Sequence, residues 1–255
     1  MADKLLNDFE KIKLTEEESK VIGERLIASE DEGTKNQIAL SLVGKLLTSK
    51  HFNVEAMKRT LTSVWKLHNN VVIKMVESNL FVFQFFNDVD KEKLIDGSPW
   101  FFDGKLLLLK DIDGEEQPSE VVFQYVPMWV RLLDVPFSKR NRRNLTEIGD
   151  FLGIFLEIDE TEPLGIGEFM RMKVMIDIDR PLRRGLFLVV GASASKWISL
   201  KYERLEDFCF FCGRLDHTEG TCSFKDEIRG EGDDIVYEYG PWLPTSPRRP
   251  IQKSE

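Results

Sequence analysis

The chain has 255 residues, of which 42% are hydrophobic and 31% are charged, so it is long enough to fold as one or two domains. Lysine and arginine number 35 against 44 acidic residues, and the net charge of −9 excludes a uniformly basic coat for duplex DNA. The 3 cysteines lie within one short segment, which is a poor basis for a disulfide framework and indicates a reducing, intracellular setting.

The first part of the chain, residues 1–36, is predicted to be a helical arm. Its apolar residues recur at three- and four-residue spacing, and Thr15 with Glu18 has the pattern of a capping box. The acidic residues that follow Thr15 suit the positive end of a helix dipole. A loop over residues 30–36 is expected to end the arm.

Residues 37–112 are predicted to form a β-α-β-β-α-β domain. Helices are expected to begin after Asn53 and at Asp88 or Asp90, and strands are expected at 39–48, 71–76, 80–86 and 106–109. This order is the ferredoxin-like arrangement, which RNA-recognition domains share.

Three phenylalanines alternate along the third of these strands, at Phe81, Phe83 and Phe85, and therefore share one face. If that face is open it offers bases a stacking platform, and if a helix covers it the rings are core. We favour core, because aromatic residues in strands usually pack against other elements.

A second small α/β segment is expected over residues 113–203. It begins in an acidic loop with Gly114 and Pro118, and its helix is expected at 144–151, with strands at 126–133, 172–178, 186–190 and 197–202. Residues 226–255 are polar and proline-containing, so we expect a disordered tail there. The fold class is thus α+β, with a zinc-binding segment at 204–225.

The zinc-binding segment contains every cysteine of the chain at the spacing C-x2-C-x4-H-x4-C, formed by Cys209, Cys212, His217 and Cys222. Three thiolates and one imidazole complete the tetrahedral shell of zinc and leave no position for a reacting water. Gly213 can adopt the positive φ that a tight turn between the ligands requires. The pattern predicts one structural Zn²⁺, while the alternative of three unrelated buried thiols would need a coincidence of spacing.

This segment resembles the zinc knuckle of retroviral and retrotransposon gag-type proteins. The resemblance implies that Phe210 and Leu215 form a small platform for an unpaired base, beside Arg214. Asp216 and Glu219 depart from the family pattern, at positions where glycine and a basic residue are common. Between residues 203 and 229, seven acidic residues face four basic ones, which weakens any attraction for phosphate.

Most of the chain, from about residue 14 to 243, also resembles a plant family in which a domain of unknown function precedes such a knuckle. The residues that carry this resemblance are Leu14-Thr15-Glu16-Glu17-Glu18, Leu80-Phe81-Val82-Phe83-Gln84-Phe85, Pro99-Trp100-Phe101-Phe102, Trp129-Val130-Arg131, Tyr202-Glu203-Arg204-Leu205 and Tyr239-Gly240-Pro241-Trp242-Leu243. The resemblance implies a gag-like nucleic-acid-binding role, in a LINE-type retrotransposon or in a host gene descended from one.

Two basic stretches are candidates for binding a phosphate backbone. The first is free of acidic residues over 137–146 and contains Lys139, Arg140, Arg142 and Arg143. The second is looser and contains Arg171, Lys173, Arg180, Arg183 and Arg184. A solvated basic surface is an equally good interpretation of each.

No nucleophile–base arrangement emerges, since zinc uses the cysteines, and Gly165-Ile166-Gly167 lacks the rest of a phosphate loop, so we expect no enzymatic activity. Two binding functions remain open. The protein could bind single-stranded RNA or DNA weakly, or it could be an interaction adaptor with a protein partner or with itself, its knuckle purely structural. We expect a nuclear or cytoplasmic location and no membrane partner, because no signal peptide or membrane-spanning stretch is evident.

Overall fold

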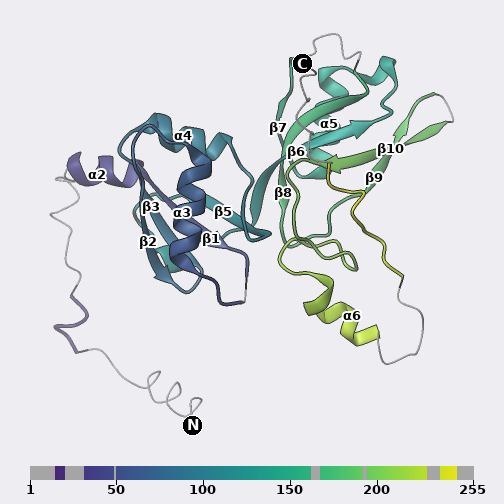
Figure 1. The fold of residues 1–255 in the computed structure, drawn as a ribbon. Helices are drawn as coiled ribbons and strands as arrows, with labels where there is room; N and C mark the ends of the chain where they lie inside the picture. Colours follow the sequence, from purple (N-terminus) through teal and green to yellow (C-terminus); the bar gives the residue numbers. More distant parts are fainter. Residues whose placement is uncertain are drawn as a thin grey trace, which may run out of the picture. The chain divides into compact units, whose positions relative to one another are not determined.

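The computed structural model is drawn as a ribbon in Figure 1. The chain divides into two compact units, residues 1–38 and 39–255, and both sheets described below belong to the second. It describes residues 15–20, 32–48, 50–161, 167–191, 194–228 and 236–245. In the first unit, Thr15 N donates to Glu18 Oε2 (2.7 Å) and Glu18 N donates to Thr15 Oγ1 (3.3 Å). These reciprocal bonds are the predicted capping box. Most of the predicted helical arm lies outside the described residues.

A helix, α2 (Glu32–Ala39), occupies the segment where the sequence predicts a loop and the start of a strand. The prediction is wrong here. The segment after Gly33 contains no proline or glycine and includes good helix formers, so helical geometry costs little. The strand begins only at Ser41.

The first sheet of the second unit has five antiparallel strands in the order β2-β3-β1-β5-β4. Its elements follow along the chain as β1 (Ser41–Leu46), α3 (Val54–Trp65), β2 (Val72–Glu77), β3 (Leu80–Gln84), α4 (Asp88–Asp96), β4 (Trp100–Phe102) and β5 (Lys105–Asp111). Asn53 caps α3 as predicted, by accepting a hydrogen bond from Ala56 N (2.9 Å). The cap of α4 is Asn87, which precedes both of the predicted start positions.

Strand β4 is an addition to the predicted elements. It pairs with β5 across a two-residue turn in which Asp103 and Gly104 have φ angles of 50° and 74°. Positive φ at both central residues is typical of the turn that best fits the twist of a β-hairpin, and Asp-Gly between apolar runs is its strongest sequence signal. That signal was available in the sequence.

One face of the first sheet packs against α3 and α4. Met57, Leu61 and Trp65 recur at four-residue spacing along α3 and are buried against Phe81 and Phe83. Phe85, just beyond β3, is buried in the same cluster. The phenylalanines are therefore core, as favoured above, and offer no platform.

The opposite face of the central strands is covered as well. Val43 and Leu80 are buried there with Val121, which follows the short helix η1 (Pro118–Glu120). Ile112 and Phe123 pack against the same cluster. The acidic loop and the residues that follow it thus bring apolar side chains onto the sheet, and both faces of β1 and β3 are occupied.

A buried carboxylate ties the loop after α3 to the start of α4. Asp90 is 1% exposed and accepts hydrogen bonds from His68 N (2.8 Å), Asn69 N (2.8 Å) and Asn87 Nδ2 (2.9 Å). Desolvation alone would raise the pKa of Asp90, but these hydrogen bonds outweigh it and hold the pKa well below its ordinary value.

Asp90→Asn is expected to destabilise the first sheet by about 2 kcal/mol, because an amide presents a donor where a second acceptor is needed. Since the folded-state pKa is lowered, the stability that Asp90 contributes is present above about pH 4 and is lost as the pH falls below that value. Urea unfolding of wild type and variant as a function of pH measures both effects. The exposed Asp88→Asn on the same helix is the control, and equal losses in the two variants would contradict the assignment.

The second sheet also has five antiparallel strands, in the order β7-β8-β6-β10-β9. Its elements are β6 (Tyr125–Leu133), η2 (Phe137–Lys139), α5 (Arg142–Leu152), β7 (Ile154–Ile158), β8 (Phe169–Asp177), β9 (Gly185–Val189) and β10 (Ser195–Tyr202). All but η2 and β7 correspond to predicted elements, most of them longer than expected. One face is a core in which alternate residues of β6 and β8 meet Leu145, Ile148 and Leu152 of α5.

The prediction of a disordered tail from residue 226 is wrong for two segments. The helix α6 (Ser223–Ile228) extends past residue 226, and residues 236–245 pack on the second sheet. β9 pairs with residues 195–199 of β10 and leaves the end of that strand edge open at Tyr202. The segment 236–245 fills this position: Tyr202 N donates to Leu243 O (3.1 Å), and Tyr202 O accepts from Thr245 N (2.9 Å). Leu243 is fully buried, so apolar burial and an open strand edge order a segment of unremarkable composition. Within the described part of the chain, no helix is long and apolar enough to cross a bilayer.

Candidate metal centre

The four predicted zinc ligands come together in one cluster. The sulfur atoms of Cys209, Cys212 and Cys222 and a ring nitrogen of His217 all lie within 4.8 Å of one another. Cys209 and Cys222 are buried, and the other two are half-buried. This donor set and spacing fit one tetrahedral zinc ion, with all four positions filled by protein.

A neighbouring carboxylate fixes the histidine in the form that zinc requires. Asp216 Oδ1 lies 2.7 Å from His217 Nδ1, while His217 Nε2 lies 3.2 Å from Cys212 Sγ. Protonated Nδ1 donates to the carboxylate and leaves the Nε2 lone pair for the metal, which is a common outer-shell arrangement at zinc sites. Asp216, which departs from the knuckle pattern, therefore has a defined role in orienting a ligand.

The turn between the first two cysteines is held by backbone hydrogen bonds. Gly213 N donates to Cys209 O (2.8 Å), and Cys209 N donates to Arg214 O (2.9 Å). Gly213 has φ +77°, as the sequence predicts. In the metal-free thiols, burial raises the pKa of Cys209 and Cys212, so metal binding has to displace their protons.

The knuckle is part of the second sheet's core and not an appendage. Phe208, Leu215 and Leu205 are buried in the same cluster as β6, β8 and β10. Gly213 O accepts from Leu182 N (2.9 Å), and Phe210 O accepts from Tyr239 N (3.1 Å). The zinc site therefore ties the segment before β9 and the segment 236–245 to one loop.

Of the two residues implied by the resemblance to form a base platform, one is buried and the other is half-buried. Leu215 is only 4% exposed and belongs to the core, contrary to that expectation. Phe210 is half-buried, with its ring centroid 4.9 Å from that of Phe208. Arg214 extends over the Phe224 ring, 5.1 Å from the centroid. The sequence showed the ring and the leucine at the right spacing, but burial against a distant segment could not be read from spacing.

The basic stretch at 139–143 is partly used within the fold. Arg140 donates to Val135 O (2.8 Å) and to Gly167 O (2.9 Å), and Arg142 pairs with Glu160 (3.2 Å). Lys139 is half-buried, and Arg143 is exposed at the first turn of α5. These four residues do not form one cluster of unpaired cations.

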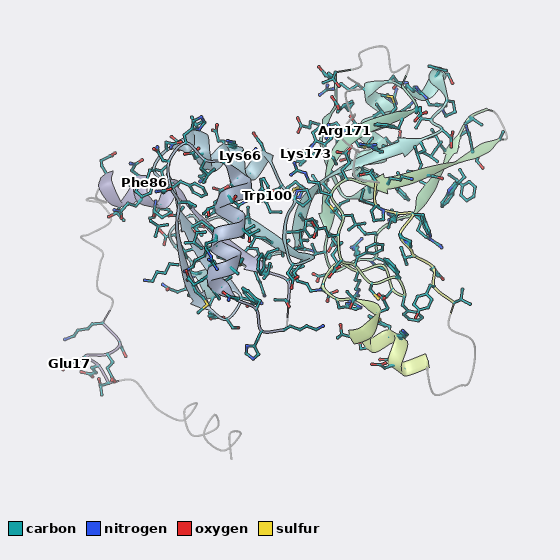
Figure 2. All side chains as sticks on the ribbon, in the orientation of Figure 1. Glu17, Lys66, Phe86, Trp100, Arg171 and Lys173 are labelled. Atoms are coloured by element: carbon teal, nitrogen blue, oxygen red, sulfur yellow. The ribbon has the colours of Figure 1, made fainter. Side chains whose placement is uncertain are left out.

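Arg171 and Lys173, from the second basic stretch, are two positions apart on β8 and therefore lie on the same face of the strand (Figure 2). Arg171 lies 3.6 Å from the centroid of the Trp129 ring and donates to Glu203 and to Asp159 (2.8 Å), while Lys173 pairs with Glu157 (3.4 Å). Lys173 is buried and also donates to Asp96 O (3.3 Å). Neither cation is available to a phosphate.

Glu203 joins two arginines of this sheet face in one ion-pair cluster, which its position in the sequence did not predict. It accepts from Arg131 Nε (2.6 Å) as well as from Arg171 Nε and Nη2 (3.0 Å each). Desolvation would raise the pKa of Glu203, but the two guanidinium groups outweigh it and lower the pKa. Their positions on neighbouring strands, opposite each other, were not visible without the strand register.

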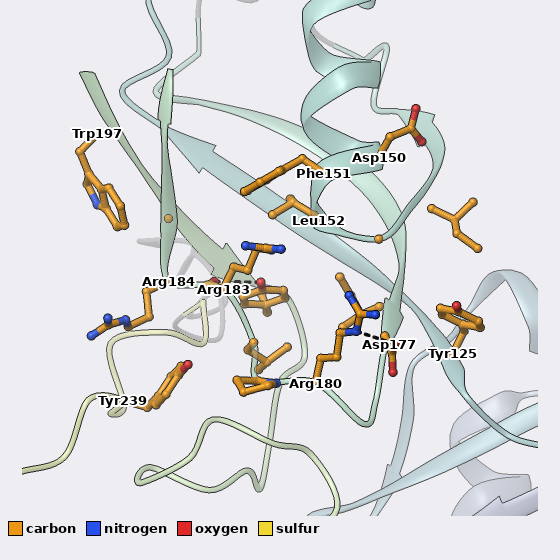
Figure 3. Close-up of a pocket in the computed structure, with 17 residues that line it drawn as sticks. Tyr125, Asp150, Phe151, Leu152, Asp177, Arg180, Arg183, Arg184, Trp197 and Tyr239 are labelled. Atoms are coloured by element: carbon orange, nitrogen blue, oxygen red, sulfur yellow. Dashed lines mark hydrogen bonds and ion pairs between the residues drawn. The ribbon is translucent and has the colours of Figure 1, made fainter. Parts of the chain in front are cut away.

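The remaining residues of the second stretch line a hollow of about 550 Å³ on the second sheet. Figure 3 shows Arg180, Arg183 and Arg184 there, with Phe151 beside Arg183 and Trp197 on the Arg184 side. Tyr239, from the segment expected to be disordered, lines the same hollow.

Two family models match parts of the chain. Residues 34–120 match a domain of unknown function (DUF4283), and residues 176–224 match the zinc knuckle. The chain thus has a DUF4283 domain followed by a zinc knuckle. The second match begins within β8, consistent with a knuckle that folds together with the second sheet. A comparison with curated proteins gives no match to this chain.

Proposed function

We propose that this chain, a DUF4283 domain followed by a zinc knuckle, is a non-catalytic protein that binds single-stranded RNA or DNA and uses zinc as a structural staple. The observation that carries the proposal is the aromatic surface of the second sheet. Large exposed rings occur in this part of the chain, among them Phe137, Phe151, Phe187, Trp197 and Trp242. Phe151 lies against Arg183. Rings and guanidinium groups are the side chains on which unpaired bases stack.

The first sheet supports a ferredoxin-like fold, but it does not support contact with nucleic acid. Its strand order, together with helices after β1 and β3, supports a ferredoxin-like domain over residues 37–112. The central strands of RNA-recognition domains use one sheet face for bases. Because both faces of β1 and β3 are covered here, we assign nucleic-acid binding to the second segment, 113–203, together with the knuckle, 204–225.

The charge of the chain sets the expected strength of binding. A net charge of −9 repels phosphate at long range, so we expect weak affinity and a shallow salt dependence. The order of a DUF4283 domain and a knuckle resembles gag-like proteins of LINE-type elements, and we propose that origin. A reverse-transcriptase reading frame downstream of the gene would support it.

Fluorescence anisotropy with labelled single strands at low salt tests the proposed function. We expect binding of RNA and DNA oligonucleotides with little sequence preference, and weaker binding of the matching duplex. Zinc content is measured on the same samples. Absence of any binding at low salt, with one zinc per chain retained, would falsify the proposal.

A specific observation favours a second candidate, an adaptor that binds a protein partner or itself. Phe187 is 70% exposed and Val189 63% exposed on the outer strand β9, an apolar face of the kind that interfaces use. In that case sedimentation would detect self-association, or a protein partner would bind, while single strands would not bind.

A further inference from the structure

We infer that a single strand binds along one track of the second sheet, formed by two adjoining hollows that share Arg184 and Trp197. This inference rests on the proposed function and names its site. The first hollow is the one described above, with Phe151 and Arg183. The second, of about 470 Å³, is lined by Arg184, Trp197, Lys201 and Trp242. Because Arg184 and Trp197 line both hollows, the two hollows adjoin, and the inferred strand passes from one to the other over these two residues.

Rings and cations lie together in both hollows. The Arg183 guanidinium carbon lies 4.1 Å from the centroid of the Phe151 ring, and that of Arg184 lies 5.6 Å from the centroid of the Tyr239 ring. Trp197 and Trp242 are 43% and 48% exposed, so each presents a ring face or edge to solvent. A basic groove interleaved with rings is the general design of surfaces that bind single strands, because rings stack on bases while cations pair with the backbone.

The charges of the track identify Arg183 as its strongest phosphate ligand. Asp177 pairs with Arg180 (3.2 Å), and Glu238 pairs with Arg184 (3.4 Å). Asp150, the other acidic residue at the first hollow, accepts from Phe155 N (3.2 Å). Within the part of the chain that the structure describes, no carboxylate pairs with Arg183, and no acidic residue lines the second hollow. Charge complementarity therefore favours an anionic occupant in a protein that is otherwise acidic.

The backbone that carries the arginines is held in place before any ligand binds. Tyr202 Oη donates to Arg183 O (2.9 Å), and Leu200 N donates to Arg184 O (3.0 Å). Tyr202 is buried, so this anchor is shielded from water. A backbone that is already ordered loses less conformational freedom on binding, which favours affinity.

The test compares single-strand affinity among Arg183→Ala, Trp197→Ala and Lys201→Ala, with Arg143→Ala as the matched control. Arg143 is an exposed arginine of α5 that does not line either hollow. We expect each track variant to weaken binding about tenfold, and Arg143→Ala to bind like wild type. Melting temperature and zinc content show whether each variant is folded. If Trp197→Ala does not fold, Arg183→Ala and Lys201→Ala still test the track.

The outcomes separate this inference from the proposed function. If wild type binds no single strand, the proposed function fails. If wild type binds and the track variants match Arg143→Ala, the function stands and the track is overturned. Competition with polyglutamate distinguishes the occupant: displacement of the strand only by nucleic acid supports base recognition, whereas equal displacement by the acidic peptide overturns it in favour of an acidic protein segment.

Discussion

Loss of zinc is expected to unfold the core of the second sheet, and not only the knuckle. His217→Ala removes a ligand of the cluster, and the metal shell then no longer closes. Binding of a structural zinc ion is worth about 10–16 kcal/mol in knuckle-sized peptides, against a stability of about 5–15 kcal/mol for a typical protein. Phe208 and Leu215 flank the ligands and are buried among the strands, so the loss spreads into the sheet.

Thermal unfolding and hydrogen exchange on the full chain measure this effect. We expect lower zinc content, a lower melting temperature and loss of amide protection in β6 and β10. A chelator should reproduce the result on wild type, and added zinc should reverse it. His51→Ala, an exposed histidine outside the cluster, is the control. A His217→Ala protein with wild-type zinc content and stability would refute the assignment of the ligand.

Gly213→Ala is expected to release the segment 236–245 from the knuckle, at a cost of about 3 kcal/mol. Two causes add. The φ of +77° is unfavourable for any residue with a Cβ atom, and that Cβ would lie 2.3 Å from Cζ of Tyr239. The ring cannot simply tilt, because Tyr239 N is bound to Phe210 O at the same place. Tyr239 and Trp242 should then leave the proposed track.

Limited proteolysis and thermal unfolding test this prediction, and the control comes from the same loop. Gly220→Ala places its Cβ 4.0 Å from Thr218 Oγ1, the nearest atom, so it should be tolerated. We expect faster cleavage near residues 236–245 and a lower melting temperature for Gly213→Ala alone. Identical behaviour of the two variants would show that Tyr239 is not held against Gly213.

Local patterns predicted much of the fold. Apolar spacing located α3, α4 and α5 and most strands, because helix and strand periods are set by residues close in sequence, and the Asn53 cap also located the start of α3. Strands β4 and β7 and helices α2 and α6 were missed. β7 begins directly after α5 and Gly153. It is an edge strand on which the apolar residues Ile154 and Leu156 are exposed, so its sequence lacks the alternation of buried apolar and exposed polar residues that indicates a strand.

The zinc site shows most clearly what the sequence determined by itself. Its four ligands lie within fourteen residues, so the chain has little freedom to separate them, and spacing alone identified them. The acidic surroundings that seemed only to oppose nucleic acid include Asp216, which orients a ligand. The overall charge of −9 thus describes the chain but not the roles of its individual acids.

Only the tertiary structure decided which residues remain available for binding. Burial and ion pairing depend on segments that are distant in sequence: Leu215 is covered within the core of the second sheet, and Arg171 is neutralised by Glu203, 32 residues away. Arg183 lies in the same basic stretch, yet no carboxylate pairs with it among the described residues. Composition and spacing cannot distinguish such arginines, because the difference arises from strand register and long-range packing.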